Sequence, residues 1–117
     1  MQRAWAELLA YERKNPTGLA HTALKLSVEF PEDDSKALAA RASKIAGTAV
    51  QPDTFRKQLS RARRLFAEFM VVETARTLEA PSAQLVEQEL IDTGVMTFIK
   101  EFLPEDWRTR TELTNPG

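Results

Sequence analysis

The chain has 117 residues, of which 43% are hydrophobic and 28% are charged, and its formal net charge is −1. This length suits one domain with a single core, and the near-neutral total is unlike that of a generally basic nucleic-acid coat protein. The chain has no cysteine and one histidine, His21, which excludes disulfides and thiolate metal sites and leaves little for a zinc centre or a histidine-activated nucleophile.

Helical periodicity fills the segments between the prolines and glycines, and no segment alternates apolar and polar residues for long, as a strand would. The pattern predicts an all-α fold, a helical bundle. Its helices are expected, in chain order, over residues 2–14, 18–29, 36–46, 52–80, 81–94 and 95–103. The polar segment 109–117 is expected to be a flexible tail.

Start and stop signals are clearest around the third and fourth helices. The acidic stretch 32–34 predicts a helix N-terminus, because the helix dipole favours negative charge there. Gly47 suits the position just after the third helix, and Val50 is expected to be the apolar plug of the turn that follows. Pro52 opens the fourth helix, which is long because nothing breaks it before Pro81.

Apolar residues at helical spacing predict the side chains that face inward. They are Trp5, Leu8, Leu9, Leu19, Ala23, Leu26, Phe30, Leu38, Ala42, Ile45, Phe55, Leu59, Ala62, Phe66, Phe69, Val71 or Val72, Ala75, Leu78, Leu85, Leu90 and Ile91. The apolar arc of the fourth helix widens after Leu65, so its second half is expected to be covered on more than one side. Trp107 is expected to be a core or lid anchor.

The net charge of −1 conceals three unequal segments. Residues 1–34 carry −2, residues 35–64 carry +7 and residues 65–117 carry −6. The basic segment coincides with a helix, a glycine turn and a second helix, which is the layout of a helix-turn-helix.

The second helix of this segment has the pattern of a recognition helix. Its apolar stripe, which begins with Phe55 and Leu59, lies within about 60° on a helical wheel, and the bases point away from that stripe. The residues expected to contact DNA are Thr54, Arg56, Lys57, Ser60, Arg61 and Arg64. A plain solvated face is the alternative, although five bases within residues 56–64 without an internal acid are unusual for one.

Residues 53–69 resemble the recognition helix in region 4 of bacterial RNA polymerase sigma factors of the extracytoplasmic-function type. Thr54-Phe55, Leu59 and Arg61-Ala62-Arg63 match the family pattern in register, and residues 38–47 resemble its first helix. The whole chain is also similar to the C-terminal part of sigma-like proteins of planctomycete bacteria. One departure is the segment from Gly47 to Thr54, which is about two residues longer than the usual turn.

The resemblance implies a non-enzymatic domain that binds the −35 promoter element in the major groove and docks on the β-subunit flap of core RNA polymerase. The region that opens the −10 element in that family has no counterpart in this chain. The expected organisation is a single helical domain with N-terminal helices (1–34), the helix-turn-helix (35–70), a C-terminal helical extension (71–108) and the tail (109–117).

Two alternatives remain open. In the first, the helix-turn-helix belongs to a protein-interaction or dimerisation module. Such a module would not read DNA and would pair with polymerase, an anti-sigma factor or a second copy of itself. The acidic segment 65–117 is either a solvated cap over the long helix, a mask for the basic face, or part of a homodimer interface.

Several other classes of protein are disfavoured. No apolar run approaches the ~20 residues of a membrane helix, and the N-terminus has no signal-peptide core, so we expect a soluble cytoplasmic protein without a membrane partner. The triplet Asp92-Thr93-Gly94 matches aspartic proteases but ends a predicted helix, where a cap is expected. The acids 32–34 lack EF-hand spacing. We therefore expect no catalytic residues, metal or cofactor.

Overall fold

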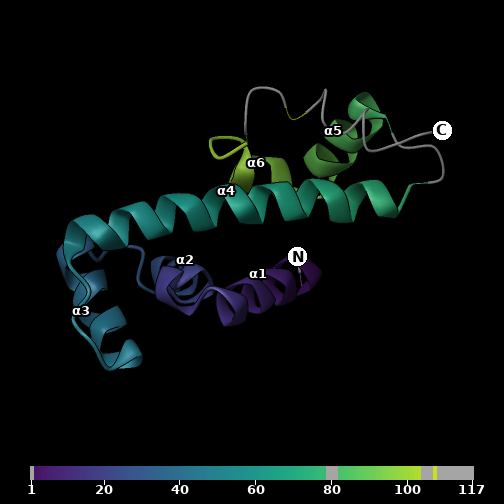
Figure 1. Cartoon of the computed structure of the whole chain (residues 1–117). Coiled ribbons are helices and arrows are strands. Elements are labelled where there is room, and N and C mark those ends of the chain that lie inside the picture. The colour runs from purple at the N-terminus through teal and green to yellow at the C-terminus, as the bar shows by residue number, and fades with distance from the viewer. Residues whose placement is uncertain (1, 79–81, 104–106, 108–117) are drawn as a thin grey trace. The chain divides into compact units, whose positions relative to one another are not determined.

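The computed structural model describes residues 2–78, 82–103 and 107 (Figure 1). Every regular element among these residues is a helix, which confirms the all-α prediction. The elements are α1 (Gln2–Lys14), the short 3-10 helix η1 (Pro16–Gly18), α2 (Ala20–Glu29), α3 (Ser35–Ala46), α4 (Pro52–Arg76), α5 (Ala83–Asp92) and α6 (Val95–Ile99). The predicted tail, 109–117, lies outside the described residues.

The predicted start of α2 and the predicted end of α4 are wrong for local reasons. Helix α2 does not begin at residue 18, because residues 16–18 form η1 and Leu19 then adopts a left-handed backbone with φ of 47°. Helix α4 ends at Arg76 rather than at residue 80. There the hydroxyl and the N–H of Thr77 both donate to the carbonyl of Thr74, which replaces the helical hydrogen-bond pattern with a tighter turn.

The chain divides into two compact units, and each is described by itself. The N-terminal unit comprises residues 5–63, and the C-terminal unit comprises residues 64–117 together with residues 1–4. Helix α4 crosses this boundary, so its first half (52–63) belongs to the N-terminal unit and its second half (64–76) to the C-terminal unit.

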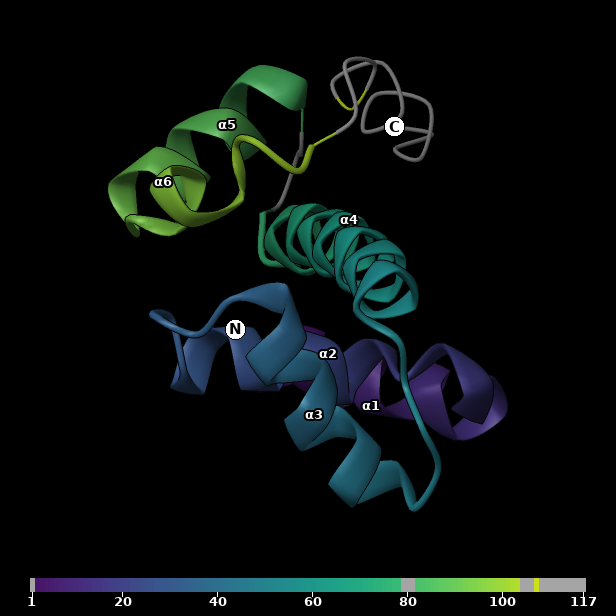
Figure 2. The ribbon, with the colours of Figure 1, turned by 90° about the vertical axis from the view of Figure 1, so that its left-hand side faces the viewer.

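In the N-terminal unit, α2 and α3 lie on the same side of the first half of α4 in both views (Figures 1 and 2). The core of this unit is aliphatic except for one phenylalanine. Its buried side chains are Leu8, Ala20, Ala23, Leu24, Leu26, Leu38, Ala39, Ala42, Phe55, Leu59 and Ala62. Most of the predicted inward positions are thus confirmed, while Trp5, Leu9, Leu19 and Phe30 are half-buried.

Ile45 is the clear error in this unit, because 62% of it is exposed. It shares a face of α3 with Leu38 and Ala42, which are both buried. However, Ile45 lies in the last turn of α3, where the described side chains leave most of it uncovered. The helical periodicity is therefore right, and the length over which α3 is packed was overestimated.

In the C-terminal unit, α5 and α6 pack against each other. The buried side chains are Ala4, Phe66, Ala67, Met70, Val71, Thr74, Ala83, Val86, Leu90, Ile99 and Trp107. Leu85 and Ile91 are about half exposed, so their predicted inward positions are wrong. Helix α5 buries instead the face that carries Ala83, Val86 and Leu90, which are spaced three and four residues apart.

The remaining expectations for this unit are settled by burial and by helix ends. Val71 is buried and Val72 is exposed, which decides between the two, while Phe69, Ala75 and Leu78 are half-buried. Helix α6 ends at Ile99 rather than at residue 103, because the N–H of Phe102 donates to the carbonyl of Ile99 at 2.9 Å and so forms a tighter turn.

The predicted helix caps are confirmed. The Asp34 carboxylate accepts the backbone N–H of Ala37 at 2.9 Å and so caps the start of α3. Gly47 ends α3 with a left-handed backbone (φ 72°). Gly94 (φ 80°) follows α5 in the same conformation, as expected for a cap rather than a protease triplet.

Candidate nucleic-acid interface

The turn between α3 and α4 comprises residues 47–51 and is longer than the three to four residues usual in a helix-turn-helix. Ser43 holds this turn against α3. Its hydroxyl oxygen accepts the backbone N–H of Val50 at 2.8 Å and donates to the carbonyl of Ala39 at 2.8 Å. The longer turn is therefore tied to the preceding helix at its fourth residue, which orients the start of α4.

The first half of α4 is anchored by a narrow buried stripe. Phe55, Leu59 and Ala62 are all buried, at successive spacings of four and three residues. The N–H of Phe55 donates to the carbonyl of Gln51 at 2.9 Å, which begins the helical hydrogen bonding. Since one side of the helix is fixed to the core, the residues on its other side must face outward.

The basic face of α4 consists of Lys57, Ser60 and Arg61, with Arg56 on its flank. All four are exposed. Lys57 and Arg61 are one helical turn apart, and neither forms an ion pair with a described residue. Two cations that repel each other on one turn thus have no counter-charge within the part of the chain that the structure describes.

Three of the other bases on α4, those nearest this face, have different surroundings. Arg56 forms an ion pair with Asp53, but both side chains are well exposed, and an exposed pair of this kind is weak. Arg63, outside the predicted set, is half-buried and has its own interactions. Arg64 is exposed as predicted, but it is the first residue of the C-terminal unit.

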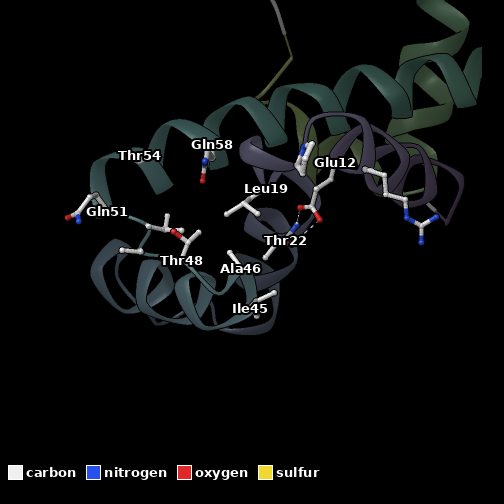
Figure 3. Close-up of a pocket in the computed structure, with 13 residues that line it drawn as sticks. Glu12, Leu19, Thr22, Ile45, Ala46, Thr48, Gln51, Thr54 and Gln58 are labelled. Carbon is white, nitrogen blue, oxygen red and sulfur yellow. Dashed lines mark hydrogen bonds between the residues drawn. The ribbon is translucent and has the colours of Figure 1, made fainter.

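Thr54 is exposed, as a DNA contact requires, but it also borders a groove within the N-terminal unit (Figure 3). The groove has a volume of about 640 Å³. It lies where the end of α1, the start of α2, the end of α3 and the start of α4 converge. Its lining includes Glu12, Leu19, Thr22, Ile45, Thr54 and Gln58. Nothing in the spacing of these residues predicts the groove.

One wall of the groove is polar. The Glu12 carboxylate on α1 accepts both the backbone N–H of Thr22 (2.8 Å) and its hydroxyl (3.1 Å), which joins α1 to the start of α2. His21 stands edge-on to Trp5, with ring centroids 5.7 Å apart. Burial lowers the pKa of His21, because desolvation of the imidazolium outweighs the attraction of Glu12.

The acidic stretch before α3 has structural partners. Asp34 is the helix cap, and the Asp33 carboxylate pairs with Arg41 at 2.8 Å, while the Arg41 guanidinium lies 3.5 Å from the ring centre of Phe30. Across residues 2–78, 82–103 and 107, no three acidic or histidine side chains gather as metal ligands do. None of the helices in those ranges has the length and hydropathy of a membrane span.

Comparison with known proteins supplies no further guide. No family model matches this chain, and no curated protein or solved structure shows significant similarity to it. Any function must therefore be inferred from the residues and geometry of the chain itself.

Proposed function

We propose that the N-terminal unit is a non-enzymatic DNA-binding domain, similar to sigma region 4, that binds the −35 promoter element and docks on the β flap of core RNA polymerase. The observation that carries this proposal is the basic face of α4. Lys57 and Arg61 are exposed and without an acidic partner among the described residues, on a helix anchored by buried Phe55 and Leu59.

The arrangement suits the major groove of DNA. A helix fixed by its opposite side presents its outward side chains with little loss of backbone freedom on binding. Lys57 and Arg61, one turn apart, can reach phosphates or the acceptor atoms of guanine, and Ser60 can bond to either. Thr54, in the first turn of α4, adds a hydroxyl beside backbone N–H groups that favour a phosphate.

The charge of the two units supports a local rather than a general attraction to DNA. Residues 5–63 carry ten basic and seven acidic residues, a net charge of +3, while the C-terminal unit carries six basic and ten acidic residues, a net charge of −4. Binding by the isolated domain is therefore expected to be weak and strongly salt-dependent. Docking on polymerase would raise the effective concentration of the basic face at a promoter.

The test is selection of binding sequences from a random duplex pool, followed by fluorescence anisotropy at low and moderate salt. The double variant Lys57→Glu, Arg61→Glu should weaken binding by about tenfold or more, since it removes two contacts and adds two negative charges. Lys36→Glu is the control, because it places an acid in the first turn of α3, where the helix dipole tolerates it.

Other results would change the proposal. Binding that is unaffected by the double variant would show that DNA contacts a different face. No binding at low salt, combined with a dimer in sedimentation or capture of core polymerase or an anti-sigma factor by the full chain, would favour the protein-interaction module.

A further inference from the structure

The groove of the N-terminal unit has the size and lining of a small-molecule site. We propose that it binds a small organic cation, an ammonium group carried on an apolar body. Its volume, about 640 Å³, falls within the range of about 300–1,000 Å³ typical of ligand pockets. This proposal does not depend on DNA binding, since every residue used below lies outside the basic face.

The apolar part of the lining would hold the body of the ligand. Figure 3 shows the Leu19 side chain directed into the groove, with Ile45 at its lower edge. The half-buried Val50 also contributes to the lining. A large aliphatic side chain that is 62% exposed, as Ile45 is, gains from being covered by an apolar group.

The charge of the lining favours a cation over a neutral head group. Glu12 is the only acidic residue among the described residues that line the groove, and it is half-buried. A carboxylate has about four acceptor positions, of which Thr22 occupies two, so others remain for a ligand. Arg13, the one basic side chain in the described part of the lining, is exposed and forms no ion pair with Glu12.

The backbone at Leu19 is a second indication. Its φ and ψ of 47° and 35° lie in the left-handed region that bulky residues avoid. Strain of this kind persists where surrounding structure requires it and is common at ligand sites. The adjacent Gly18 would adopt the left-handed conformation more easily, but Leu19 is the residue that adopts it. As a result, an aliphatic side chain points into the groove.

The experiment compares two probes that differ in one group, 2-(1-naphthyl)ethylamine and 2-(1-naphthyl)ethanol. Each is titrated into the full chain, and amide chemical shifts are followed by NMR. Both should shift signals of Leu19, Ile45 and Val50, and the amine should bind about tenfold more tightly, the increment expected for a hydrogen bond to a charged group.

Variants separate charge from shape. Glu12→Gln should remove the preference for the amine, because the neutral amide no longer attracts the ammonium group while its oxygen still accepts the N–H of Thr22. Glu29→Gln, an exposed acid on α2 outside the groove, is the matched control and should keep the preference. Ile45→Lys places a cation at the exposed rim and should weaken the amine more than the alcohol.

Three results would overturn the proposal. These are the absence of shifts at the groove residues at millimolar probe, equal affinity for the two probes, and an unchanged preference for the amine in Glu12→Gln. The amide spectrum of each variant reports whether the fold is intact. Should Glu12→Gln lose its fold, the test passes to Ile45→Lys, whose equal effect on both probes would also refute the proposal.

Discussion

The two halves of α4 are one continuous helix, yet they are built for different surroundings. The first half (52–63) buries a narrow stripe of Phe55, Leu59 and Ala62 and carries a net charge of +3. The second half (64–76) buries a wider arc and has two basic and two acidic residues, so its net charge is zero. A narrow buried stripe leaves most of a helix surface for a partner, whereas a wide one uses that surface for packing.

The wider arc is seen directly in the burial of adjacent residues. Phe66 and Ala67 are both buried, as are Met70 and Val71, and Thr74 follows one turn later. Pairs of neighbours cannot both lie on a narrow stripe, because they are 100° apart around the helix. The charge and burial of each half, and not the net charge of the chain, therefore indicate where a nucleic acid could bind.

The largest effects are expected from core truncations that test whether the two units are independent. Phe55→Ala and Phe66→Ala should each cost about 3–5 kcal/mol, because both rings are fully buried. Trp5 reports on the N-terminal unit and Trp107 on the C-terminal unit. In urea titrations of single-tryptophan variants, Phe55→Ala should lower the Trp5 midpoint more, and Phe66→Ala the Trp107 midpoint.

The matched control for these truncations is Phe98→Ala. This ring is 41% exposed and touches Phe66 edge-on, with centroids 5.8 Å apart, so its loss should cost much less. If both tryptophans reported one shared midpoint in every variant, α4 would couple the units into a single cooperative structure, and the comparison of its halves would concern charge alone.

A smaller effect is expected at the turn that precedes α4. Ser43→Ala removes the acceptor of the Val50 N–H and should cost about 1–2 kcal/mol, in the N-terminal unit only. Ser60→Ala, on the exposed basic face, should be nearly neutral in the same urea titration. Equal costs at the two serines would mean that Ser43 does not hold the turn.

Sequence patterns predicted most of the helices and caps because these depend on neighbours in the chain. The capping aspartate before α3, the glycine after it and the stripe on α4 all follow from local spacing. The patterns failed where a helix extends beyond the packed core, as α3 does at Ile45. They also failed where a helix has several apolar faces that could point inward, as α5 does at Leu85.

The candidate site divides in the same way. The exposure of Lys57 and Arg61 follows from helical geometry, since they lie opposite the buried stripe. The groove does not follow from helical geometry. It depends on the hydrogen bond between Glu12 and Thr22, ten residues later, and on the left-handed backbone of Leu19. Neither feature has a local signature, and both arise from how α1 and α2 meet.

Helix caps offer one matched test in each unit. Asp34→Ala should cost about 1 kcal/mol, because its carboxylate accepts the Ala37 N–H at 2.9 Å at the start of α3. Ser82→Ala, at the start of α5, should cost less, since its bond to the Leu85 N–H is longer at 3.3 Å. Thermal unfolding of both variants measures the difference, and a larger loss for Ser82→Ala would contradict this ranking.

The smallest effect is expected from His21, and only below neutral pH. Burial lowers the pKa of His21 below its usual 6.5, so the unfolded chain takes up a proton before the folded chain does. The contribution of His21 to the free energy of unfolding is therefore fully present above pH 6.5, and it is lost as the pH decreases from 6.5 to the folded-state pKa.

His21→Phe keeps an aromatic ring beside Trp5 but does not titrate. In the Trp107→Phe background, the urea midpoint seen by Trp5 fluorescence should fall more between pH 8 and pH 5 with histidine than with phenylalanine at position 21. An equal fall in both would assign the pH dependence to the carboxylates of the N-terminal unit instead.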